Sequence, residues 1–134
     1  MQKKCLRLAL KTYPDFAEAA FNLGIMLAQS SPAESIEFCQ KAYRLRPENI
    51  RYGYTLAFFL NQNGRAGEAI KVLSKMIDNS TATSDIYTFL AAIYENQGRK
   101  REALDVYRKA IENENLPMQD RFMLEARLKA AHRQ

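Results

Sequence analysis

The amino-acid sequence predicts an all-α fold, a solenoid of stacked antiparallel helix pairs. Helix-favouring residues such as Ala, Leu, Glu and Lys dominate the 134 residues, whereas the strand-favouring valine occurs only at Val72 and Val106. Three segments of similar sequence begin at Glu34, Glu68 and Glu102, 34 residues apart. A fixed period of this length is typical of repeat proteins, in which each short unit stacks on its neighbours to bury its apolar side chains.

The helices can be assigned in order along one array that spans residues 1–134. Residues 1–13 are interpreted as the second helix of an incomplete unit, so we expect the chain to be a piece of a longer repeat protein. Three complete units follow at residues 14–49, 50–83 and 84–117. Their first helices are predicted at residues 17–29, 50–62 and 84–96, and their second helices contain the repeated segments 34–43, 68–77 and 102–111.

The turn residues between these helices support the assignment. Gly64 and Gly98 follow two of the first helices and favour a turn that ends each helix, whereas Ser30, Ser31 and Pro32 replace the glycine in the first unit. The last segment, residues 118–134, is predicted to be a capping helix with two apolar stripes on roughly opposite sides. One stripe comprises Phe122, Met123, Ala126 and Ala130, and the other comprises Leu124, Leu128 and Ala131. We expect one of them to cover the third unit.

Residues at corresponding positions of the units resemble the tetratricopeptide repeat family. The first helices share the spacing seen in Ala20, Leu23, Gly24 and Leu27, in Gly53, Leu56, Ala57 and Leu60, and in Tyr87, Leu90, Ala91 and Tyr94. The second helices share the spacing seen in Ser35, Cys39 and Ala42, in Ala69, Leu73 and Met76, and in Ala103, Tyr107 and Ala110. Pro14 and Pro47 occupy the closing position, where Thr81 and Asn115 stand later. The resemblance implies a right-handed superhelical array in which Gly24, Ala57 and Ala91 allow close helix contacts.

The resemblance also implies a concave groove, lined by the first helices, that holds an extended peptide or a helix. By alignment, the groove residues are Phe21, Asn22, Ile25, Gln29, Arg51, Tyr54, Phe58, Gln62, Asp85, Thr88 and Asn96. Some family members bind chaperone C-termini through a clamp of Lys, Asn and Arg. The aligned positions here hold Phe21, Ile25, Thr55, Asp85 and Phe89, so this clamp is absent.

The remaining residues disfavour other classes of function. His132 is the single histidine and lies near the chain end, and no phosphate-binding or zinc-binding motif occurs, so we expect no enzyme, metal site or cofactor. Cys5 and Cys39 are interpreted as buried apolar side chains rather than a disulfide or ligand pair. No signal peptide or transmembrane segment is seen, which favours a cytoplasmic location.

The function predicted from these observations is a protein-protein interaction module without a small-molecule substrate or a membrane. Two alternatives stay open: the groove aromatics pack only against one another, or the chain is an architectural spacer or an oligomerisation segment that self-associates through its ends. A nucleic-acid-binding solenoid is the least favoured, because the net charge of +5 is concentrated at the two ends of the chain rather than along the groove.

Overall fold

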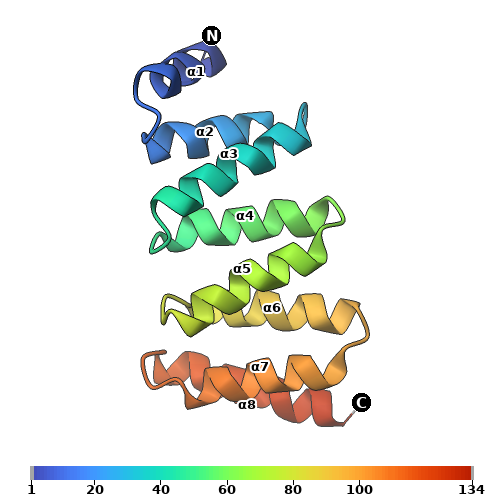
Figure 1. The fold of residues 1–134 in the computed structure, drawn as a ribbon. Helices are drawn as coiled ribbons and strands as arrows, with labels where there is room; N and C mark the ends of the chain where they lie inside the picture. Colours follow the sequence, from blue (N-terminus) through green and yellow to red (C-terminus); the bar gives the residue numbers. More distant parts are fainter. Residues whose placement is uncertain (1, 134) are drawn as a thin grey trace. The chain divides into compact units, whose positions relative to one another are not determined.

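The computed structural model describes residues 2–133, and this part of the chain folds into eight α-helices (Figure 1). They are α1 (Gln2–Thr12), α2 (Ala17–Leu27), α3 (Pro32–Leu45), α4 (Ile50–Gln62), α5 (Ala66–Asp78), α6 (Ser84–Asn96), α7 (Lys100–Glu112) and α8 (Met118–His132). No strand occurs in residues 2–133, so the predicted all-α fold class is confirmed.

The ends of the helices follow the local sequence. Helices α4 and α6 begin and end at the predicted residues, whereas α2 ends at Leu27 rather than at residue 29. The difference arises because Pro32 opens α3 and restricts the preceding Ser31 to non-helical backbone angles (φ −144°, ψ 73°). The Ser31 amide donates to the Leu27 carbonyl at 2.8 Å, which closes the turn between the two helices.

Glycines end α4 and α6, as the sequence predicts. Gly64 and Gly98 have φ values of 77° and 72°, in the left-handed region that glycine adopts without a steric penalty. The following amides, of Arg65 and Arg99, each donate at 2.8 Å to the helix carbonyls of Leu60 and Tyr94. The chain can therefore reverse within a few residues, and after Gly98 this turn brings α7 against α6.

The helices form two compact units that divide within α5, between Val72 and Leu73. The N-terminal unit has one buried apolar cluster that joins α1, α2, α3 and α4. Its buried members are Leu10, Ala17, Ala19, Ala20, Phe21, Leu23, Leu27, Ala42 and Tyr52. Complete burial of one large apolar side chain contributes roughly 1.5 to 3 kcal/mol, so this cluster stabilises the packing of these four helices.

Helices α2 and α3 are in close contact at Gly24. A β-carbon built on this residue would lie 2.6 Å from Cys39 Sγ and 3.1 Å from the Ser35 carbonyl oxygen. The Ser35 hydroxyl donates to the Gly24 carbonyl at 2.6 Å, so the buried polar side chain is satisfied at the same contact. The small residue expected from the sequence is therefore required by the packing of these two helices.

Helix α1 packs on the N-terminal unit along one side only. Leu10 is buried, and Leu6 and Ala9 are half-buried against the same apolar cluster. Cys5 is exposed, so the expectation that it is a buried apolar side chain is wrong. The physical reason is its position at the edge of the contact with α2, where no other described helix covers it. Cys39 is buried as predicted.

In the C-terminal unit, α8 packs on α6 and α7. Leu124 is buried, Leu128 and Ala131 are half-buried, and these three side chains form the stripe that covers the unit. The Ser84 hydroxyl donates to the Asp120 carboxylate at 2.7 Å, and Arg121 Nε donates to the Ile111 carbonyl at 3.1 Å. These hydrogen bonds fix the start of α8, so its other apolar stripe faces away from the unit. Within that stripe, Phe122 is 74% exposed and Met123 is 56% exposed.

Candidate functional site

The groove residues predicted in the N-terminal unit lie on matching faces of α2 and α4. Ile25 is 41% exposed, Tyr54 is 36% exposed and Phe58 is 44% exposed, although all three are large apolar or aromatic side chains. Asn22 on α2 and Arg51 on α4 are exposed beside them. We call the surface formed by Asn22, Ile25, Arg51, Tyr54 and Phe58 the α2–α4 face. Gln29, two residues after α2, and Gln62, the last residue of α4, lie beyond it, and both are exposed.

Phe21 was predicted to line this surface, but its side chain is buried beneath it. Its side chain is only 1% exposed, and its ring lies against the Tyr52 ring with the two centroids 4.6 Å apart. The Arg51 guanidinium covers the ring at 5.0 Å from its centroid. The expectation that Phe21 is a direct contact residue is therefore corrected: it joins α2 to α4 and supports the Arg51 side chain above it. The Phe21 side chain is long enough to reach α4 of the next helix pair, where Tyr52 and Arg51 cover its ring.

A pocket opens beside the α2–α4 face, between α1 and α2. Its volume is about 570 Å³. It is lined by Gln2, Cys5, Leu6, Asn22, Ile25, Met26 and Arg51, and we call it the α1–α2 pocket. The sequence analysis did not identify the contribution of α1 to a binding site. The available signal was the row of apolar residues on residues 1–13, of which Cys5 and Leu6 line the pocket.

The groove residues predicted in the C-terminal unit lie along one face of α6. Asp85 and Asn96 are exposed. Thr88 is half-buried, and its hydroxyl donates to the Ser84 carbonyl of the same helix at 2.8 Å. The Thr88 hydroxyl is therefore already engaged within α6, which leaves Asp85 and Asn96 as the polar side chains that this face presents to solvent.

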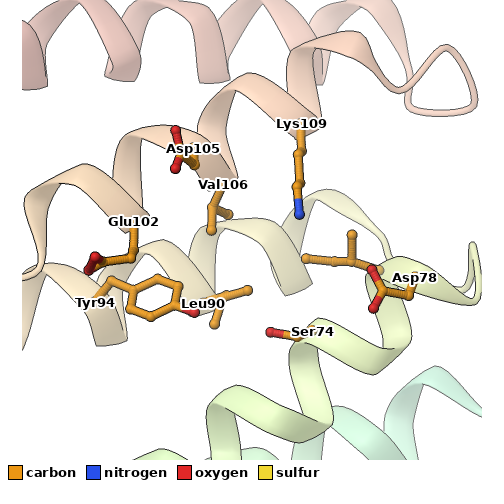
Figure 2. Close-up of a pocket in the computed structure, with 9 residues that line it drawn as sticks. Ser74, Asp78, Leu90, Tyr94, Glu102, Asp105, Val106 and Lys109 are labelled. Atoms are coloured by element: carbon orange, nitrogen blue, oxygen red, sulfur yellow. The ribbon is translucent and has the colours of Figure 1, made fainter.

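A second pocket, of about 230 Å³, lies in the C-terminal unit between the end of α5, α6 and α7 (Figure 2). Leu90, Tyr94 and Val106 form its apolar part, and Lys109 extends from α7 towards it. Its acidic residues are largely paired elsewhere: Glu102 accepts from Arg99 at 3.0 Å, and Asp105 accepts from Arg108 at 3.1 Å. These are exposed ion pairs between neighbouring residues of α7 and the turn before it, and Ser74 and Asp78 complete the polar part of the lining from α5.

The two cysteines lie in opposite environments. Burial raises the pKa of the Cys39 thiol to about 11, and a hydrogen bond with Ser35 only partly offsets that effect. Cys5 is exposed at the α1–α2 pocket. In residues 2–133, no three His, Cys, Asp or Glu side chains converge as metal ligands. None of the helices in the described part of the chain has the length and hydropathy needed to span a bilayer.

We therefore expect one fast-reacting thiol per folded chain. A thiolate is the reactive species, and with a pKa of about 11 Cys39 is about one part in a thousand thiolate at pH 8, in addition to being shielded by α2. Titration with an aromatic disulfide reagent should modify Cys5 quickly and Cys39 only after guanidinium is added. Equal rapid modification of both thiols in the native protein would contradict the close contact between α2 and α3.

Comparison with protein families gives matches along most of the chain. A family model described as "Tetratricopeptide repeat" matches residues 26–93, and a second model with the same description matches residues 84–115. The first match alone covers half of the 134 residues. It includes α3, α4 and α5 entirely, and with α4 the Arg51, Tyr54 and Phe58 side of the α2–α4 face.

Known proteins with similar sequences are much longer than this chain. Human "Protein IFIT1 homolog B" is 23% identical over 121 residues, which cover 82% of this chain and 25% of that protein. Human "Protein O-mannosyl-transferase TMTC1" is 34% identical over 79 residues, which cover 59% of this chain and 9% of that protein. The chain thus spans a quarter or less of the length of these two relatives.

Solved structures share the arrangement of helices. The crystal structure of MamA matches with a TM-score of 0.69 at 21% identity, covering 98% of this chain and 85% of that one. TTC0263, a tetratricopeptide repeat protein of Thermus thermophilus, matches with a TM-score of 0.67 at 17% identity, covering 98% of this chain and 72% of that one. At these identities the similarity shows the fold, and it confirms the predicted solenoid of helix pairs.

Proposed function

Because this chain belongs to the tetratricopeptide repeat family, we propose that it is a protein-interaction module that holds a peptide segment of a partner protein on the α2–α4 face. The family and its fold are typical of interaction scaffolds rather than of enzymes. The transferase activity named for one relative belongs to that whole protein, of which this chain spans 9%. The proposal assigns no catalytic residue.

The observation that carries the proposal is the exposure of three large side chains on one surface. Ile25, Tyr54 and Phe58 keep between 36% and 44% of their surface in water, whereas apolar side chains on other sides of the same helices, such as Leu23 and Leu56, are buried. Exposed apolar clusters with polar neighbours are typical of interaction sites. Aromatic side chains at such a site supply much of the binding free energy of a peptide.

The proposal is tested by Phe58→Lys. We expect this substitution to weaken binding of peptides selected from a displayed random library by about tenfold or more, because a charged ammonium replaces an aromatic contact. Helicity should be retained, since Phe58 is 44% exposed. Binding is measured by fluorescence polarisation of the selected peptides and helicity by circular dichroism.

The matched control is Phe122→Lys, which removes an even more exposed phenylalanine from α8. It should leave peptide affinity unchanged. A library that yields no binders, or binders that respond equally to the two substitutions, would argue against the α2–α4 face as the peptide site.

Self-association through α8 is the second candidate function, and a separate observation favours it. Met118 is 77% exposed beside Phe122 and Met123, and together they form a shallow apolar surface with Ala126. A second copy that covered this surface would bury the stripe that the unit leaves in water. We expect Phe122→Lys to lower the apparent mass in sedimentation velocity at high protein concentration. A wild-type chain that is monomeric at every concentration would contradict this candidate.

A further inference from the structure

We infer that the α2–α4 face selects peptides in which an acidic residue stands close to a large apolar side chain. The acidic side chain would bind Arg51, and the apolar side chain would enter the α1–α2 pocket. This inference rests on the proposed function, because it specifies which peptides the same surface prefers.

The first step is the orientation of Arg51. Its guanidinium lies over the Phe21 ring, and that ring is held in place because it is 1% exposed and packs in a tilted arrangement against Tyr52. A guanidinium over the face of an aromatic ring is attracted to that face, which restricts the positions that it can take. A preoriented guanidinium loses little side-chain freedom when a carboxylate binds, and two parallel hydrogen bonds can then form.

The second step is the lack of an acceptor for these N–H groups. Among residues 2–133, the contact of the Arg51 guanidinium is with the Phe21 ring, and it forms no hydrogen bond or ion pair, although it is exposed at the edge of an apolar pocket. By contrast, Arg65 and Arg99 are paired with Glu68 and Glu102. Arg51 therefore differs from the arginines that serve to stabilise helix starts, and its donors are available to a ligand.

The third step is the neighbouring pocket. Leu6, Ile25 and Met26 give the α1–α2 pocket an apolar lining, and its volume of about 570 Å³ exceeds that of any single side chain. Asn22 lies in the same lining and offers an amide to a peptide backbone. Because Arg51 also lines this pocket, one short peptide segment can reach both the apolar lining and the guanidinium.

The local charge favours an acidic partner. Helix α1, which forms one wall of the pocket, carries Lys3, Lys4, Arg7 and Lys11 and no acidic residue. On α2, Glu18 lies among the residues of a different pocket, with Asp15 and Arg46. The α1 residues in the pocket lining, Gln2, Cys5 and Leu6, are uncharged, and Arg7 is paired with Glu34 of α3. Arg51 is the charged side chain of the lining, and it complements a carboxylate there. The α2–α4 face continues past Arg51 to Tyr54 and Phe58, so the acid is placed inside a peptide rather than at its C-terminus.

The test is a selection from a random 12-residue library whose C-terminus is fused to the display protein, so that no terminal carboxylate is present. Wild type should enrich Asp or Glu within three positions of a large apolar residue. Arg51→Leu should lose the acidic preference and bind the winning peptides about tenfold or more weakly, while Arg44→Leu, which removes an exposed charge on α3, should bind them as wild type does. The winning peptides are then synthesised with Asp changed to Asn, or Glu to Gln, and with a free or an amidated C-terminus.

The outcomes separate this inference from the proposed function. Binders that depend on Phe58 but show no acidic enrichment, or that bind Arg51→Leu and Arg44→Leu equally, would overturn the inference and leave the proposed function standing. Winning peptides whose affinity depends on a free C-terminus and not on the Asp or Glu side chain would also overturn it. A library without binders would overturn both.

The pocket is tested independently through Cys5, which lies in its lining. A bound peptide should slow alkylation of Cys5 severalfold, with buried Cys39 as the internal reference in the same chain. Cys5→Trp should fill part of the pocket and shift the selected apolar residue from Phe or Leu towards Ala or Val. Lys4→Trp, on the same helix but outside the lining, should not shift it. Unchanged alkylation in saturating peptide would contradict occupancy of the pocket.

Discussion

Replacing Phe21 by alanine should lower the free energy of unfolding by about 3 to 5 kcal/mol, the range found when a large buried aromatic side chain is removed from a well-packed core. Phe21 is 1% exposed and fills the space between α2 and α4. The substitution removes its contact with Tyr52 at 4.6 Å and the surface on which the Arg51 guanidinium rests. Urea denaturation followed by circular dichroism measures the loss.

Phe58→Ala is the matched control for Phe21→Ala. Phe58 is 44% exposed, so its truncation leaves no enclosed cavity and should lower stability by less than about 1 kcal/mol. If the two alanine variants unfolded at the same urea concentration, Phe21 would not be a core residue, and the description of the α2–α4 face would need to change. Phe58→Ala should weaken peptide binding more than Phe21→Ala does, when both are measured under conditions in which Phe21→Ala remains folded.

Replacing Gly24 by alanine should destabilise the N-terminal unit by about 1 to 3 kcal/mol, the range for adding a methyl group to a filled core. The added β-carbon would lie 2.6 Å from Cys39 Sγ and 3.3 Å from the Cys39 amide nitrogen. The sulfur can move only by a change in its own side-chain rotamer, whereas the amide belongs to the backbone of α3. Helices α2 and α3 must therefore separate slightly, which weakens the contacts along their whole length.

Gly67→Ala is the matched control, because Gly67 also lies within a helix and a β-carbon there meets no atom within 4 Å. It should raise stability by about 0.5 to 1 kcal/mol through the better helix propensity of alanine. Adding Cys39→Ala to Gly24→Ala should recover part of the lost stability by removing the sulfur. Equal effects of the two glycine substitutions, or no coupling with Cys39, would show that α2 and α3 are farther apart than described.

These expectations also separate folding from recognition. Gly24 and Phe21 act on the stability of the N-terminal unit, whereas Phe58 and Arg51 act on what the α2–α4 face binds. Variants of the second kind should bind differently without unfolding earlier, which makes them suitable for assigning partners. Variants of the first kind would lose binding indirectly and should not be used for that purpose.

The sequence alone determined the helical class, the 34-residue period and the bounds of α4 and α6. These properties depend on neighbouring residues: helix propensity, the spacing of apolar side chains and glycine at the turns that follow α4 and α6. Repetition strengthened the prediction, because three units carry the same pattern. The small residue at Gly24 could also be predicted, since a small residue recurs at the same position of every unit.

The tertiary structure decided which side chains on the first helices reach water. Alignment placed Phe21 and Phe58 on the same surface, yet the first is covered by Tyr52 and Arg51 of the next helix pair, and the second is 44% exposed. The exposed Cys5 and the α1–α2 pocket likewise depend on how far α1 covers α2. Burial is set by the neighbours that a side chain meets in space, and helical periodicity gives only the direction in which it points.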